Sequence, residues 1–123
     1  MKLRIKGNSI RFRLTRTEVA DLSDKGFVES SLIIGSNEFV YGIISDDMAE
    51  SPTAMFVDTK LIVSIPREQA QLWTNSNAVS ITNSGSSLPN ILIEKDFACL
   101  DVRRGDDDVD TFPNPKATTG AIS

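Results

Sequence analysis

Histidine is missing from the 123-residue sequence, and cysteine occurs once. Without histidine the chain lacks the commonest general base and metal ligand of proteins. This excludes a Ser-His or Cys-His nucleophile within the chain, so catalysis would have to rely on carboxylates, lysines or a hard metal ion. The single Cys99 excludes an internal disulfide, and because it lies in the apolar run FACL we expect a buried, inert thiol. These absences favour a non-enzymatic role.

Long apolar runs are also missing. No segment approaches the roughly 20 consecutive apolar residues that a membrane helix needs. The opening MKLRIK carries basic side chains without an apolar stretch behind them, so a secretory signal is not expected. With 40% hydrophobic residues, the chain has enough apolar material for the core of one domain. We therefore expect a cytoplasmic protein that does not contact a membrane.

Charge is unevenly distributed along the chain. The net charge is -4, from 13 basic and 17 acidic residues. Six of the basic residues lie within the first 16 positions, a stretch that contains no acid: Lys2, Arg4, Lys6, Arg11, Arg13 and Arg16. The sequence thus combines a basic start with an acidic body.

The first 26 residues carry signals for a hairpin followed by a helix. Residues 2–6 and 9–14 alternate polar and apolar side chains, which is typical of half-buried strands. Gly7 and Asn8 fit a two-residue hairpin turn between them. Thr15 and Glu18 form a capping box, which predicts a short helix over 16–24 that ends at Gly26.

The rest of the ordered pattern repeats this theme. We expect strands at 27–34 and 38–45, a second hairpin within 54–65, a second helix over 66–73, and strands at 75–82 and 91–100. Pro66 suits the first position of the second helix, where its missing N–H is not needed. Trp73 lies beside Leu72 on that helix, and we expect it to pack in the core.

A shift of 51 residues superposes the pattern of about 2–44 on that of about 53–95. We therefore predict a single domain over 1–102 that consists of two pseudo-repeats. The expected fold is α+β: a duplicated, mostly antiparallel sheet curled into a barrel or cradle, with two short helices. Residues 103–123 are acidic and then rich in proline and threonine, which predicts a loose, extended or disordered tail. Within this tail we expect Phe112 to dock on the domain.

The basic start becomes a basic surface once the hairpin is paired. With the turn at Gly7 and Asn8, Lys6 pairs with Ser9, Arg4 with Arg11 and Lys2 with Arg13, so that Lys2, Arg4, Lys6, Arg11 and Arg13 share one face. Like charges directly opposite each other cost on the order of 0.2–1 kcal/mol per pair. A counter-charge is therefore expected.

The second hairpin differs from the first. Met55, Val57 and Ile62 occupy the positions that are basic in the first hairpin. Both of its faces are apolar, which predicts that it is covered on both sides.

Three kinds of partner could neutralise the charge of the basic face. The first is the protein's own acids: Glu29, Asp58, Glu94, Asp96 or the run Asp106, Asp107 and Asp108. The second is a phosphate-bearing small molecule, since converging Arg and Lys suit phosphates. The third is an acidic protein or a nucleic acid, but Phe12 points to the opposite face and the chain is net acidic, which argues against nucleic acid.

Metal chemistry has few candidates. Glu94 and Asp96 share one face of a strand and, with Glu29, could hold Mg²⁺ for action on phosphate esters. The aspartates at 106–108 and Asp110 lack the ligand order of a calcium loop, which favours a solvated tail.

Two resemblances follow from these residues. The runs KLRIKGNSIRFRLTRTEV and ILIEKDFACL, with DTFPNP near the end, resemble a small family of uncharacterised bacterial proteins across nearly the whole chain. That likeness implies no functional residues, because the family has no assigned activity.

The duplicated order of strands and helices also resembles the CYTH-like, or triphosphate tunnel, fold, whose barrel holds polyphosphates with a divalent metal. That family carries an ExExK motif in its first strand. Here Lys2, Arg4 and Lys6 occupy the comparable spacing, so only the final lysine matches and the expected metal ligands are replaced. The resemblance implies a binding relative without cofactor, or alternatively a metal-dependent phosphohydrolase with Mg²⁺.

Overall fold

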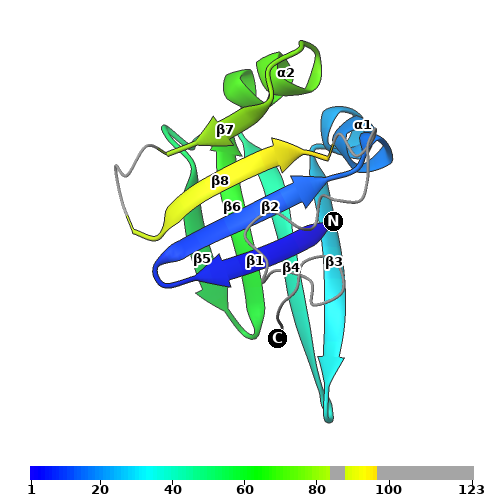
Figure 1. Ribbon diagram of the computed structural model, residues 1–123, viewed down its shortest axis with the longest axis vertical. Coiled ribbons are helices and arrows are strands. Elements are labelled where there is room, and N and C mark those ends of the chain that lie inside the picture. Colours follow the sequence, from blue (N-terminus) through cyan, green and yellow to red (C-terminus); the bar gives the residue numbers. More distant parts are fainter. Residues whose placement is uncertain (84–87, 97–123) are drawn as a thin grey trace, which may run out of the picture.

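The computed structural model describes residues 1–83 and 88–96, which form two sheets and two helices (Figure 1). Cys99, the acidic run at 106–108, Phe112 and the rest of the stretch 103–123 lie outside the described residues. Neither helix of the described part has the length and apolar character that are needed to cross a membrane.

The first half of the chain contains two hairpins joined by a helix: β1 (Lys2–Lys6), β2 (Ser9–Leu14), α1 (Arg16–Lys25), β3 (Phe27–Ile34) and β4 (Asn37–Asp46). The second half has the same order: β5 (Thr53–Val57), β6 (Lys60–Pro66), α2 (Arg67–Thr74), β7 (Ser80–Thr82) and β8 (Asn90–Lys95).

The two halves are interleaved in the sheets. One four-stranded sheet has the order β1-β2-β8-β7 and the other the order β3-β4-β6-β5, so each sheet takes one hairpin from each half. The central pairs, β2 with β8 and β4 with β6, are parallel, and the four outer pairings are antiparallel. The expected α+β class with a mostly antiparallel arrangement is confirmed. The strands form two curled layers that face each other, without closing into one barrel (Figure 1).

The first hairpin of each half, β1-β2 and β5-β6, has the same strand register. Every pair of β1 and β2, from Lys2 with Arg13 to Lys6 with Ser9, has a counterpart 51 residues later, from Thr53 with Ser64 to Val57 with Lys60. An origin of the fold by duplication stays a prediction.

Turn and cap residues account for the local structure of the first half. Gly7 has φ 56°, a left-handed value that glycine adopts at little cost, and it closes the first hairpin. The capping box is present: the Thr15 side chain accepts from the Glu18 N–H, and the Glu18 carboxylate accepts from the Thr15 N–H. Gly26, with φ 85°, ends α1.

The core lies between the two sheets and beneath the helices. Its fully enclosed side chains come from both layers, with Phe12 and Ile93 on one sheet and Val63 and Ile65 on the other, each 0% exposed. Both helices cover one end of the layers (Figure 1). They contribute Leu22, Ala70 and Trp73 to the core.

Trp73 is a packing residue, as expected. Its side chain is buried, and its Nε1 donates to the Val79 carbonyl at 3.0 Å. Lys95 Nζ lies 5.3 Å from the centre of the indole ring and donates to the Ser76 carbonyl at 2.8 Å. These contacts hold α2 against the end of β8.

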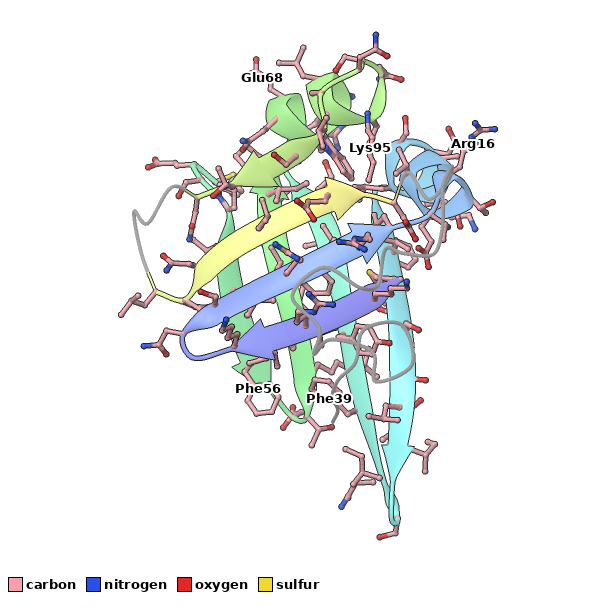
Figure 2. All side chains as sticks on the ribbon, viewed as in Figure 1. Arg16, Phe39, Phe56, Glu68 and Lys95 are labelled. Atoms are coloured by element: carbon pink, nitrogen blue, oxygen red, sulfur yellow. The ribbon has the colours of Figure 1, made fainter. Side chains whose placement is uncertain are left out.

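A row of aromatic rings leads from the core toward the opposite end. Phe12 lies 6.4 Å from Tyr41, Tyr41 lies 5.7 Å from Phe39, and Phe39 lies 6.4 Å from Phe56 between ring centres. Phe39 and Phe56 lie beyond the edge strand β1 (Figure 2). Exposure rises along this row, since Phe12 is buried and Phe56 is 64% exposed.

Three expectations need correction. The second hairpin is not covered on both sides in the described structure: Met55 and Val57 are 57% and 51% exposed. The strand expected at 75–82 is short, because only Ser80–Thr82 pairs with β8. Pro66 is the residue before the first turn of α2 instead of its first helical residue, and its ψ of 138° is extended.

Candidate functional site

The five basic residues of the first hairpin lie together on the outer face of the sheet β1-β2-β8-β7. The observed register pairs Lys2 with Arg13, Arg4 with Arg11 and Lys6 with Ser9, as predicted. Their neighbours Ile10, Phe12 and Leu14 are buried on the other face. Since successive side chains of a strand point to opposite faces, the cations are directed outward. We call these five residues the basic face: Lys2, Arg4, Lys6, Arg11 and Arg13.

Exposure differs across the basic face. Lys2, Arg4 and Lys6 on the edge strand β1 are exposed, whereas Arg11 and Arg13 on β2 are half-buried. The difference arises because β2 lies between β1 and β8, and its side chains are flanked on both sides. The inner guanidiniums are therefore held in place, and the outer cations remain accessible.

Glu94 is the acid that the fold brings to this face. Because β8 runs parallel to β2, Glu94 is paired with Arg13. Its Oε1 lies 3.6 Å from Arg11 Nε and 3.8 Å from Arg13 Nη2. Both distances exceed the usual length of a hydrogen bond, so the guanidiniums retain N–H groups for another acceptor.

The face remains strongly positive after this pairing. Among the residues of β1, β2, β7 and β8 whose side chains point outward, Glu94 is the one acid, against five cations. The formal charge of the outer face of these strands is therefore +4, while the whole chain is -4. This contrast marks the basic face as the candidate site.

The other acids proposed as counter-charges or metal ligands are dispersed. Glu29 lies in β3 and pairs with Gly42, so it belongs to the other sheet. Asp58 lies in the turn between β5 and β6 of that sheet, with φ 52°. Asp96 follows β8, and its N–H donates to the Leu14 carbonyl at 2.8 Å. Within residues 1–83 and 88–96 no three acidic or cysteine side chains gather in a way that could hold a metal ion. The metal-dependent alternative stays a prediction from the sequence.

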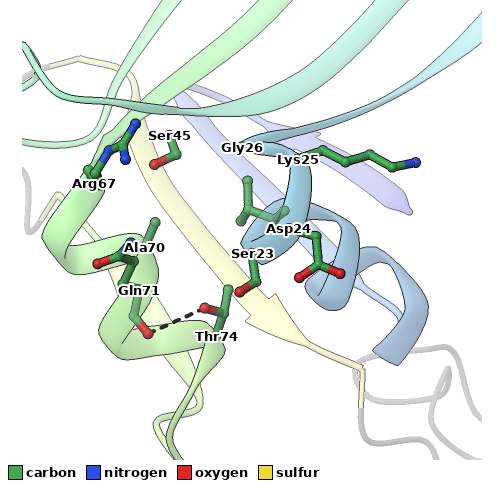
Figure 3. A pocket seen from close by; sticks show the side chains of 10 residues that line it. Ser23, Asp24, Lys25, Gly26, Ser45, Arg67, Ala70, Gln71 and Thr74 are labelled. Atoms are coloured by element: carbon green, nitrogen blue, oxygen red, sulfur yellow. Dashed lines mark hydrogen bonds between the residues drawn. The ribbon is translucent and has the colours of Figure 1, made fainter.

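A small pocket between α1 and α2, which the sequence did not predict, is a second candidate site (Figure 3). It encloses ≈ 150 Å³, and its polar lining includes Ser23, Ser45 and Thr74. Arg67 enters from the start of α2, but its Nε lies 2.5 Å from Asp47 Oδ1. This carboxylate neutralises the guanidinium, and the Nζ of Lys25, the other cation of the lining, lies 3.9 Å from Asp21 Oδ1, so each cation of the pocket already has an acidic partner.

One perturbed acid lies next to the basic hairpin without belonging to its face. Burial raises the pKa of Glu18, but hydrogen bonds from the Met1 amine, the Thr15 backbone and the Thr15 side chain outweigh it and set the pKa below its ordinary value. This carboxylate fixes the start of β1 to α1 and therefore has a structural role.

Comparison with known proteins gives a family and no activity. The sequence model of DUF7009, described as a family of unknown function, matches residues 1–116. No curated protein and no solved structure matches the chain significantly. The architectural resemblance to the CYTH-like fold is thus not supported by any match, whereas the likeness to a family without assigned activity is confirmed. Since the match covers most of the sequence, the chain belongs to DUF7009, a family of unknown function.

Proposed function

We propose that the protein binds a phosphate-bearing small molecule through the basic face. The observation that carries this proposal is the outward display of five cations around a single carboxylate on one sheet. A surface that served solubility alone would not need two cation pairs directly opposite each other, because each pair lowers the stability of the sheet. An anion bound over the basic face, between the opposed cationic side chains, would offset that repulsion.

The geometry favours phosphate as the chemical group. Arg4 and Arg11 are directly opposed, and side chains at such positions start about 5 Å apart. Two guanidiniums at this separation can donate several N–H groups to one phosphate, whose oxygens match the planar fork of arginine. Lys2 and Lys6 lie one row to either side.

The arrangement of cations in rows also indicates the shape of the ligand. Residues two apart in a strand are separated by about 6.7 Å, so the three rows of the face extend over about 13 Å. An anion with several phosphate groups in a line would contact more than one row. We therefore expect inorganic triphosphate or a nucleoside triphosphate to bind more tightly than a single phosphate or sulfate.

The test is calorimetric titration of the protein with inorganic triphosphate at low salt, without added metal. We expect the double variant Arg4→Gln/Arg11→Gln to bind about tenfold more weakly or worse, since each charge-assisted hydrogen bond contributes about 1.5–3 kcal/mol. The matched control is Arg16→Gln/Arg67→Gln, which removes the same charge from the two helices. The control should bind like the wild type.

Glu94→Gln provides an opposite prediction at the same site. Removing the one carboxylate frees Arg11 and Arg13 and should tighten triphosphate binding, a gain that damage to the fold cannot produce. A wild type that gives no binding heat at low salt, or a control pair that weakens binding as much as the Arg4 and Arg11 pair, would refute the proposal.

The protein's own acidic run at 106–108 is the rival occupant of the basic face. Replacing these three aspartates with asparagine separates the two cases. If the run competes for the face, triphosphate will bind the variant more tightly than the wild type. If the run is the natural counter-charge and no ligand is needed, the variant will lose thermal stability and the wild type will not bind triphosphate.

A further inference from the structure

The second sheet exposes an apolar outer face. Side chains that alternate with the buried Val28, Ile43 and Val63 point away from the core on all four strands of β3-β4-β6-β5. Five large apolar residues on this face are 39% to 65% exposed: Phe27, Ile33, Ile44, Met55 and Val57. We call these five residues the apolar face; the half-buried Val40 and Ile62 lie between them.

The two outer faces of the molecule contrast at matched positions. In the first hairpin β1 places Lys2, Arg4 and Lys6 outward, whereas in the second β5 places Thr53, Met55 and Val57 outward. A surface that faced only water would gain nothing from replacing cations by Met and Val. Contiguous exposed apolar side chains on an otherwise charged protein mark an interaction surface.

We propose that the apolar face packs against the same face of a second copy of this chain. Two sheets that stack through their apolar faces are a common packing mode in proteins, with a spacing of about 10 Å. The face covers four strands and four rows of side chains, or about 14 Å across the strands and about 20 Å along them. With its rim, such a contact lies near the lower limit of about 1,200 Å² in total for a stable interface. A dimer that dissociates at micromolar concentrations is therefore expected.

Charge complementarity supports a second copy as the partner. Glu29 on β3 and Lys60 on β6 are both exposed on this face, two strands and one row apart. A two-fold axis that passes over β4, between Val40 and Gly42, brings Glu29 of each copy opposite Lys60 of the other. The apolar residues then meet around the axis, and two symmetric ion pairs flank them. An isologous contact of this kind closes on itself and gives a dimer.

The experiment is sedimentation velocity of the full chain from about 1 μM to about 500 μM, the range in which an interface of this size dissociates. Met55→Lys places a charge in the apolar face and should weaken association about tenfold or more. Leu72→Lys is the matched control, because Leu72 is 71% exposed on α2, outside this face. The control should associate like the wild type.

A charge exchange tests the two-fold arrangement independently of the apolar contact. Glu29→Lys alone and Lys60→Glu alone should each weaken the dimer several-fold, because like charges then face each other. The double variant Glu29→Lys/Lys60→Glu should recover wild-type association. All four positions changed in these tests are solvent-exposed, so the variants should keep the circular dichroism spectrum of the wild type.

Each remaining outcome overturns the proposal. A chain that stays monomeric at every concentration does not use the apolar face for self-association, whether the face is free or is covered by the chain's own segment beyond residue 96. A dimer that persists in Met55→Lys, or that the charge exchange fails to restore, uses another surface.

Discussion

Arg11 and Arg13 share one carboxylate, and the weakness of this sharing keeps the basic face available. Glu94 lies 3.6 and 3.8 Å from the two guanidiniums, and the three side chains are 24% to 39% exposed. Ion pairs at this degree of exposure contribute about 0–1 kcal/mol to stability. Glu94 therefore positions the two arginines without neutralising the face.

At the residue scale, Glu18 gives a pH-dependent prediction. Its pKa is lowered in the folded protein, so its contribution to stability is complete above the ordinary carboxylate pKa and is lost as the pH falls through the folded value. Glu18→Gln keeps an acceptor for the Thr15 N–H but removes the negative charge, so it should lower the free energy of unfolding by about 0.3–1 kcal/mol at pH 7, the usual effect of losing an acid in the first turn of a helix. Between pH 7 and pH 3 the difference between variant and wild type should shrink, because protonation of Glu18 removes the charge that distinguishes it from glutamine.

Urea unfolding at the two pH values measures this difference. Asp24→Asn is the control, since Asp24 is an exposed acid near the other end of α1. A difference between Glu18→Gln and the wild type that is equally large at both pH values would show that the charge of Glu18 is not the cause.

Sequence reasoning identified the residues of the candidate site but not the pairing that completes it. The register of Arg4 with Arg11 follows from a local turn of two residues, so it could be predicted. Glu94 was one of several acids available. To select Glu94 one must know that β8 joins β2 in parallel, with paired residues 81 positions apart in the sequence, and no local pattern encodes this pairing.

At the scale of elements, Gly42 sets the pairing of β3 and β4. It is buried opposite Glu29, and a Cβ at this position would lie 2.6 Å from the Val28 carbonyl oxygen and 2.7 Å from Glu29 Cβ. Both contacts are with parts of β3 that cannot rotate away. Gly42→Ala should therefore force the strands apart and lower stability by about 1–3 kcal/mol, the usual cost of overpacking.

Thermal unfolding followed by circular dichroism measures the effect of Gly42→Ala. Ser31→Ala, at an exposed position of β3, serves as the control and should leave the midpoint nearly unchanged. If the two variants had equal midpoints, the close approach of β4 to β3 would not depend on the missing side chain.

The elements with strong local signals were predictable and those without were not. The capping box at Thr15 and the glycine after Lys25 located α1 to within one residue. β7 is only three residues long and is defined by its pairing with β8, so the alternation before it misled the prediction. The second hairpin was expected to be covered on both sides because apolar side chains are usually buried. In the structure Met55 and Val57 are exposed.

At the scale of the whole molecule, the interleaving of the two halves makes them interdependent. Each hairpin of the first half pairs with a hairpin of the second: β2 with β8 in one sheet and β4 with β6 in the other. The core also takes residues from both halves, such as Phe12 and Ile93 within one layer. Neither half retains a complete sheet by itself.

The two outer faces of the molecule differ in chemical character, one basic and one apolar, although the net charge of the chain is -4. The basic face lies on one side of the core and the apolar face on the other. A dimer formed through the apolar faces would leave both basic faces directed outward. Ligand binding and self-association should thus be independent, and Met55→Lys should not change the affinity for triphosphate.

The interleaved topology also makes a prediction about fragments. The segment between β4, which ends at Asp46, and β5, which begins at Thr53, joins the two halves. Expressed separately, residues 1–50 and 51–123 would each hold two hairpins that lack their sheet partners, and isolated hairpins are marginally stable in water. We expect each fragment alone to show the circular dichroism of an unfolded chain, and an equimolar mixture to recover the spectrum and cooperative melting of the whole protein. Cleavage of the folded chain at a protease site inserted near Ser51 should likewise leave the two pieces associated. Cooperative unfolding of residues 1–50 alone would contradict this, because it would require the two hairpins of one half to form a core without β6 and β8.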